Sequence, residues 1–110
     1  MKCNYKVWLD SDDNEKIFGI GPLIILKKID ELGSLNKAAL SMNMSYNKAF
    51  TTIKKIENKI GIKLLERYKG GASGGGSYIT DEAKSITLKY EEFDRRVGEA
   101  INNIFNEIFN

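Results

Sequence analysis

The stretch SLNKAALSMNMSYNKAFTTIKKIENKI, residues 34–60, decides the fold of this chain. Ser34 and Ser45 each precede a segment with helical apolar spacing. A serine at that position caps a helix by accepting a hydrogen bond from a backbone N–H of the first turn. Asn43 lies between the two segments and tolerates the left-handed backbone of a sharp turn, and Gly61 is typical of a helix C-terminus. The stretch therefore predicts a helix, a tight turn and a second helix.

The second of these helices has two faces of different chemistry. Its apolar face, with Tyr46 at the border, consists of Ala49, Ile53, Ile56 and Ile60. Its opposite face carries Asn47, Lys48, Thr51, Lys54, Lys55 and Asn58. Solvated helix surfaces usually mix charges of both signs, so that i,i+4 pairs form. Because this face carries lysines and almost no acid, the pattern favours an anionic partner over a merely solvated surface.

Positive charge is concentrated around this helix pair. Residues 34–80 hold eight Lys or Arg and two acids, whereas residues 1–33 hold five against six and residues 81–110 hold four against seven. The net charge of only +2 therefore hides one basic block between two acidic flanks. A basic surface beside a helix-turn-helix pattern indicates a protein that binds duplex DNA.

The segments before the helix pair predict a small hairpin and one further helix. Period-2 alternation, a polar turn cluster and a short return strand predict a β-hairpin over residues 4–18. Pro22 suits the first turn of a helix, which stops at Gly33. The helix capped by Ser34 is expected to run through Met42.

The segment after the pair predicts a β-hairpin wing. Residues 64–68 and 77–79 can pair as strands across a glycine-rich stretch, so the wing covers residues 62–79. That stretch is no P-loop, because no Gly-Lys-Ser/Thr follows it. The expected fold is mainly α, of the α+β kind. A winged helix-turn-helix domain covers residues 1–79, and a C-terminal helix covers residues 80–110.

The last helix carries an apolar seam longer than a small domain needs for its own core. Apolar residues recur at spacings of three and four, a coiled-coil-like pattern, and the helix would be roughly 40 Å long. It could fold back on its own domain, but we expect it to pair with the same helix of a second subunit. The expected dimerisation residues are Ile86, Tyr90, Phe93, Val97, Ile101, Ile104 and Ile108.

The basic block divides into base-reading and phosphate-holding positions. The first turns of the second helix normally reach base edges in the major groove, where Asn47, Lys48 and Thr51 can hydrogen-bond. Lysines further along and cations on the wing are expected to meet phosphates, which position the protein without specifying sequence. Tyr46 has two open roles, contact with DNA or packing. The full expected DNA-binding set is Ser34, Ser45, Tyr46, Asn47, Lys48, Thr51, Lys54, Lys55, Lys59, Arg67 and Lys69.

The composition argues against most other classes of function. The chain has no histidine and a single cysteine, Cys3, which excludes His-based metal sites, His triads and an internal disulfide. It has no signal-peptide h-region and no bilayer-length apolar run, which predicts a cytoplasmic protein without a membrane partner. We therefore expect no enzyme, no cofactor and no metal. The alternative function is a protein-interaction module that keeps the winged fold without binding DNA.

Several of these motifs resemble known regulators. Residues 33–83 resemble the winged helix-turn-helix of LysR-type regulators, with IKKIENKIG at residues 53–61 and LLER at residues 64–67. The closer likeness is to the N-terminal domain of the molybdate-responsive ModE family. It is visible in the Met-Ser-Tyr-x-x-Ala run at residues 44–49 and in the double and triple glycines of residues 70–76.

This resemblance implies a homodimeric transcription regulator. Its recognition helix would begin at Ser45, and its wing would carry Arg67 and Lys69. The sequence departs from the ModE pattern at Ala83, where that family usually has glycine. It also ends at Asn110, so the family's molybdate-binding C-terminal domain is not expected here. Molybdate sensing therefore does not carry over, and the effector stays unassigned.

Overall fold

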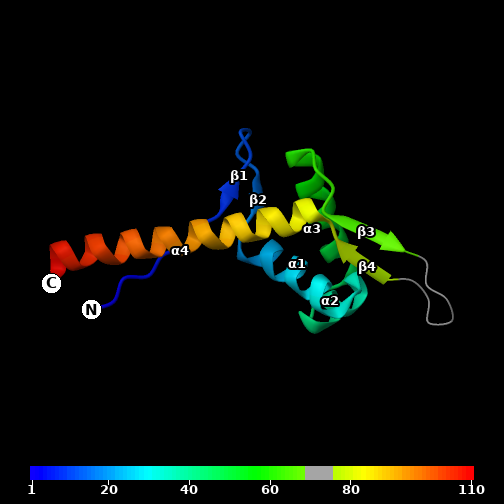
Figure 1. Ribbon diagram of the computed structural model, residues 1–110, viewed down its shortest axis with the longest axis horizontal. Helices are drawn as coiled ribbons and strands as arrows, with labels where there is room; N and C mark the ends of the chain where they lie inside the picture. The colour runs from blue at the N-terminus through cyan, green and yellow to red at the C-terminus, as the bar shows by residue number, and fades with distance from the viewer. Residues whose placement is uncertain (69–75) are drawn as a thin grey trace.

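The computed structural model describes residues 1–68 and 76–110 (Figure 1). In chain order its elements are β1 (Leu9–Asp10), β2 (Lys16–Phe18), α1 (Ile20–Leu32), α2 (Leu35–Ser41), α3 (Tyr46–Ile60), β3 (Leu65–Tyr68), β4 (Gly76–Ile79) and α4 (Asp81–Phe109). Within the described ranges, β1 pairs with β2 and β3 pairs with β4, both antiparallel. The predicted fold is confirmed: a mainly α winged helix-turn-helix with an N-terminal hairpin, a wing and a long last helix.

The helix-turn-helix is set by local capping. The Ser34 side chain accepts a hydrogen bond from the Lys37 N–H, and the Ser45 side chain accepts one from the Lys48 N–H. Asn43 has a φ of 52°, the left-handed conformation that the sharp turn requires. These three side chains confirm the predicted boundaries, except that α2 ends one residue earlier than expected.

The core lies where the apolar stripes of α1, α2 and α3 meet. Ala38 and Ala39 of α2 are buried, and their small side chains allow the neighbouring helices to approach closely. Gly33 and Gly61 end α1 and α3 with a φ of 71°, which favours glycine. The largest fully buried side chains are Phe18, Ile25, Leu26, Ile29, Leu35, Ile53 and Leu64.

The wing is anchored to the end of α1. The Ser77 N–H donates to the Gly33 carbonyl oxygen at 3.0 Å, so β4 begins against the turn between α1 and α2. A Cβ on Gly76 would lie 2.9 Å from that same oxygen, which explains why glycine stands there. The predicted wing is confirmed for the described residues; Lys69 and the glycine-rich tip, residues 70–75, lie outside them.

Helix α4 has two halves with different surroundings. Ala83 and Tyr90 in its first half are buried in the core, whereas Ile104 and Ile108 in its second half are 53% and 68% exposed. Figure 1 shows the second half extending well past the other helices, and the molecule is accordingly elongated, 61 × 29 × 24 Å. Of the helices in residues 1–68 and 76–110, none combines the length and the apolar character needed to span a bilayer.

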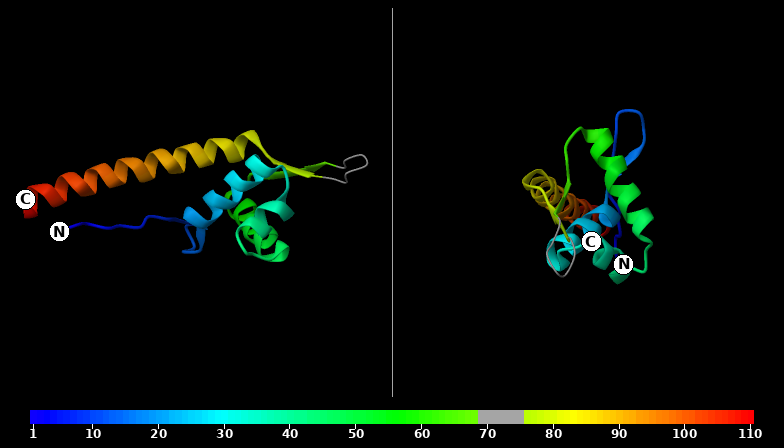
Figure 2. Two further views of the ribbon diagram at one scale, coloured as in Figure 1. Left: turned by 90° about the horizontal axis from the view of Figure 1, so that it is seen from below. Right: turned by 90° about the vertical axis from the view of Figure 1, so that its right-hand side faces the viewer.

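The N-terminal hairpin is shorter than predicted. Its first strand begins at Leu9 rather than Asn4. The preceding segment runs beside α4 instead of pairing with β2 (Figure 2, left). Tyr5 Oη donates to the Asp94 carbonyl oxygen at 3.0 Å, and Tyr90 Oη donates to the Val7 carbonyl oxygen at 2.8 Å. Alternating apolar residues predict strand pairing, but packing on a helix gives the segment the same one-sided burial.

Candidate DNA interface

The first turns of α3 present an exposed polar surface. Asn47, Lys48 and Thr51 are all exposed, and they project from the end of the helix that Ser45 caps. Ala49 and Ile53 on the opposite side are fully buried, so the core determines which face of α3 points outward. The free backbone N–H groups and partial positive charge of this helix end suit a phosphate. The structure thus gathers the predicted base-reading residues on one accessible surface.

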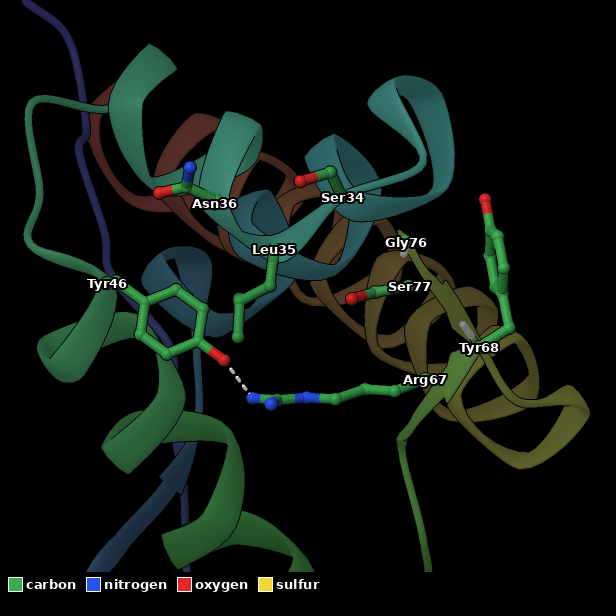
Figure 3. A pocket seen from close by; sticks show the side chains of 8 residues that line it. All are labelled: Ser34, Leu35, Asn36, Tyr46, Arg67, Tyr68, Gly76 and Ser77. Atoms are coloured by element: carbon green, nitrogen blue, oxygen red, sulfur yellow. Dashed lines mark hydrogen bonds between the residues drawn. The ribbon is translucent and has the colours of Figure 1, made fainter. Parts of the chain in front are cut away.

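Arg67 of the wing lies against the start of α3. Its guanidinium carbon is 4.9 Å from the Phe50 ring centroid and 5.5 Å from the Tyr46 ring centroid. A guanidinium N–H of Arg67 donates a hydrogen bond to Tyr46 Oη (Figure 3). The two rings stack with their centroids 6.0 Å apart. Tyr46 therefore packs within this cluster while staying 36% exposed. The cluster connects the wing to α3 and holds one cation beside the exposed surface.

An open hollow of about 450 Å³ lies between α2, α3 and the wing. Figure 3 shows the residues from these segments that line it: Ser34, Leu35, Asn36, Tyr46, Arg67, Tyr68, Gly76 and Ser77. Tyr68 and Tyr78 are half exposed and stack with ring centroids 6.2 Å apart. The sequence predicts these two tyrosines as strand packing residues rather than ligands, and it gives no local signal that places Asn36 or Tyr68 beside α3.

The lysines in the second half of α3 are paired with acids. Lys59 Nζ lies 2.8 Å from an Asp13 carboxylate oxygen and 3.5 Å from a Glu15 oxygen, and Lys55 Nζ lies 3.8 Å from Glu15. The Lys59 hydrogen bond, helped by Ser11, lowers the pKa of Asp13 to about 2. The helix itself contributes almost no acid to this face, but carboxylates of another element neutralise its second half. The acids come from the β1–β2 turn, far away in sequence.

Glu57 is a buried carboxylate that joins α3 to the wing. It is 9% exposed, and its Oε2 accepts hydrogen bonds from the backbone N–H groups of Leu64 at 2.7 Å and Leu65 at 3.1 Å. Its Oε1 lies 3.1 Å from Lys54 Nζ. Burial alone would raise the pKa of Glu57, but these donors outweigh burial and leave the pKa below its ordinary value. Sequence reasoning counted Glu57 only as a charge; its one local signal was a lone acid near the end of a basic helix.

The predicted dimerisation seam needs one correction. Tyr90 is only 4% exposed and packs on Phe18 in the chain's own core, with ring centroids 5.2 Å apart, so it is not available to a second subunit. The other predicted residues lie along one side of α4 with partial or full exposure: Ile86, Phe93, Val97, Ile101, Ile104 and Ile108. An open hollow of about 450 Å³ follows this side from Lys89 to Ala100.

Comparison with known proteins identifies related sequences. Residues 21–84, from α1 through the wing to the start of α4, match the family described as bacterial regulatory helix-turn-helix protein, lysR family. The chain is 34% identical over 84 residues to the transcriptional regulator ModE of Haemophilus influenzae, and 30% identical over 80 residues to the molybdenum transport protein ModE of Azotobacter vinelandii. These matches cover 76% and 73% of the chain but only 32% and 30% of the relatives, so the chain spans about a third of their length.

Solved structures of similar fold give a second comparison. The DBD of CbnR in a complex with DNA superposes with a TM-score of 0.56 at 18% identity, over 79% of this chain and 98% of that one. The DBD of BenM in a complex with catB site 1 DNA superposes with a TM-score of 0.56 at 18% identity, over 84% of this chain and 98% of that one. At such identities the likeness establishes the winged fold alone. Both resemblances noted in the sequence, to LysR-type regulators and to ModE, are confirmed by the sequence matches.

Proposed function

Because the chain belongs to the lysR family of bacterial regulatory helix-turn-helix proteins, we propose that it binds duplex DNA and regulates transcription. The observation that carries this proposal is the exposed, basic start of α3 beside the Arg67 cluster of the wing. A helix presented in this way fits the major groove, which is wide enough to admit it. The relatives named ModE and the DNA complexes of CbnR and BenM support the same assignment.

Within the groove, we assign base reading to the first two turns of α3. Asn47 can hydrogen-bond to adenine, Lys48 can donate to guanine, and Thr51 can donate, accept or contact a thymine methyl group. Ser34 and Ser45, at the starts of α2 and α3, lie where backbone N–H groups can meet phosphates. To reach the DNA backbone, the Arg67 guanidinium would have to give up its hydrogen bond to Tyr46 Oη.

The functional unit is a dimer formed through α4. Phe93, Ile104 and Ile108 are 45%, 53% and 68% exposed, and an apolar seam of this length on a projecting helix suits a second copy of the same helix. Residues 80–110 then serve as the dimerisation helix, although its first turns also complete the core of the domain formed by residues 1–79. A symmetric dimer would read two half-sites about 34 Å apart, or a multiple of that distance.

A salt-dependent titration with duplex DNA tests the proposal. Bound sequences are first selected from random duplexes, and affinity is then measured by fluorescence anisotropy at several salt concentrations. We expect Lys48→Ala to weaken binding about tenfold, and affinity to fall steeply with salt because phosphate contacts release counterions. Lys6→Ala, which removes the same charge from the exposed N-terminal segment, is the matched control.

The competing function is a protein-interaction module on the same fold. It predicts that no selected duplex is enriched, and that a partner captured by the chain stays bound after nuclease treatment. Salt-independent binding, or equal affinities for the Lys48→Ala and Lys6→Ala variants, would also contradict our assignment of α3.

A further inference from the structure

The β1–β2 turn lies against the second half of α3. In the end-on view of Figure 2 (right), this hairpin rises beside α3, and β2 contacts that helix. The turn carries Asp13 and Glu15, which lie 2.8–3.8 Å from the ammonium groups of Lys55 and Lys59. Two lysines that sequence reasoning assigned to phosphates therefore already have anionic neighbours within the chain.

The turn holds these carboxylates in place. The Ser11 N–H donates to the Glu15 carbonyl oxygen at 2.7 Å, and the Asn14 N–H donates to the Ser11 carbonyl oxygen at 2.9 Å. Asn14 has a φ of 66°, as a tight turn requires. Phe18, at the end of β2, is fully buried and anchors the hairpin in the core. The acids are thus presented to α3 by a compact element rather than by a long loop.

The first half of α3 differs from the second. Within residues 1–68 and 76–110, no carboxylate lies within ion-pair distance of Lys48. Lys59 stands eleven residues further along, about 16 Å on at 1.5 Å per residue. The helix therefore has an exposed cation where bases would be read, and neutralised cations where it would follow the DNA backbone.

From this arrangement we infer that Asp13 and Glu15 set how far along the DNA backbone α3 makes contact, by competing with phosphates for Lys55 and Lys59. This inference rests on the DNA binding proposed above. Exposed ion pairs are individually weak, so the turn shortens the contact and weakens it without blocking it. A lysine already neutralised by a carboxylate also releases fewer counterions, which flattens the dependence of affinity on salt.

A pair of double variants of equal charge tests the inference. Asp13→Asn with Glu15→Gln removes both contacting acids. Asp10→Asn with Asp12→Asn removes the same charge from the same hairpin, at exposed positions that the structure does not place in contact with α3. The general gain in affinity from lost negative charge is then common to both, so that the difference between them reports the contacts to the two lysines.

We expect the Asp13/Glu15 variant to bind the selected duplex about three- to tenfold more tightly than the Asp10/Asp12 variant at 0.1 M salt. Its plot of log affinity against log salt should be steeper by about one to two per subunit. The single variant Glu15→Gln, which keeps the Asp13 contacts to Ser11 and Lys59, guards against a misfolded turn and should give part of the gain. Each gain should vanish when Lys55 and Lys59 are both changed to Gln.

DNA binding and the competition for Lys55 and Lys59 can be refuted separately. If the wild-type chain binds no duplex, the proposed function is refuted and this inference is refuted with it. If the wild type binds DNA but the two double variants have the same affinity and the same salt slope, only the inference is overturned.

Discussion

Replacing Glu57 by alanine should destabilise the protein far more than the loss of a typical surface charge. The carboxylate is 9% exposed and accepts hydrogen bonds from the Leu64 and Leu65 N–H groups, both in buried residues. Alanine leaves these two backbone donors without their acceptor. Hydrogen bonds to a charged group contribute about 1.5–3 kcal/mol each, and an unsatisfied buried donor costs about as much. The side chain of its partner Lys54 is 44% exposed and is hydrated in the variant, so the lost ion pair adds little to the loss of stability.

The two bonds together give an expected loss of about 3–6 kcal/mol of unfolding free energy. Domains of this size have about 5–15 kcal/mol in total, so the loss takes a large part of the stability of the fold. In thermal unfolding it corresponds to a decrease in Tm of roughly 12–30 °C.

Urea unfolding followed by circular dichroism at 222 nm measures the effect. Wild type and variant are compared at one protein concentration, because a dimer's apparent stability depends on concentration. Glu66→Ala is the matched control: it removes the same charge from β3, where Glu66 forms an ion pair with Lys63 at 3.5 Å and with no other residue of the described ranges. We expect the control to lose less than about 1 kcal/mol. Equal losses for the two variants would refute the assigned role of Glu57.

An independent check is the difference in unfolding free energy between the wild type and Glu57→Gln, measured as a function of pH. The pKa of Glu57 is lower in the folded protein than in the unfolded chain, where it is about 4.3. A carboxylate of this kind contributes its full stability above the unfolded pKa and loses it as pH falls through the folded pKa. The difference should therefore be constant from about pH 5.5 to 8 and shrink below about pH 4. A difference that grows on acidification would contradict this sign.

Two further predictions follow from the backbone packing and from α4. Gly76→Ala should lower the unfolding free energy by about 1–3 kcal/mol, because the added Cβ would lie 2.9 Å from the Gly33 carbonyl oxygen. Gly21→Ala, with nothing within 4 Å of the added Cβ, should be neutral or stabilising by up to about 1 kcal/mol in the same urea titration. Ile104→Asp should halve the mass found by sedimentation, because it places a charge in the proposed seam, whereas Asn103→Asp on the neighbouring face should leave the dimer intact.

Sequence reasoning succeeded where structure is decided locally. The N-caps Ser34 and Ser45, the left-handed Asn43 and the terminating Gly33 and Gly61 all act within a few residues of their own position. Their side-chain chemistry and backbone preference are visible in the sequence itself, and together they determine where α1, α2 and α3 begin or end. The helix-turn-helix could therefore be placed to within about a residue at most boundaries.

Features that depend on distant segments could not be predicted in this way. The acids that pair with Lys55 and Lys59 stand forty or more residues earlier in the sequence. The sequence predicts Arg67 only as a phosphate-holding cation on the wing, but two aromatic rings of α3 lie beside its guanidinium. Tyr90 fits a seam pattern that continues along α4, and only the position of Phe18 shows that it belongs to the core. Each case needs the relative placement of two elements, which periodicity does not contain.

The contacts around Glu57 also bear on the proposed complex with DNA. If α3 enters the groove and α4 forms the dimer, as we propose, reading two half-sites requires a constant angle between these helices. Glu57 of α3 accepts from the Leu64 N–H, the Leu64 carbonyl oxygen accepts from the Thr80 N–H at 3.0 Å, and the Thr80 side chain caps α4. Thr80 Oγ1 also donates to the Lys63 carbonyl oxygen at 2.6 Å. A short path of hydrogen bonds therefore joins the two helices at the base of the wing. One end of this path is the buried Glu57 carboxylate, so in the proposed complex the group that stabilises the fold would also help to hold the angle between the two helices.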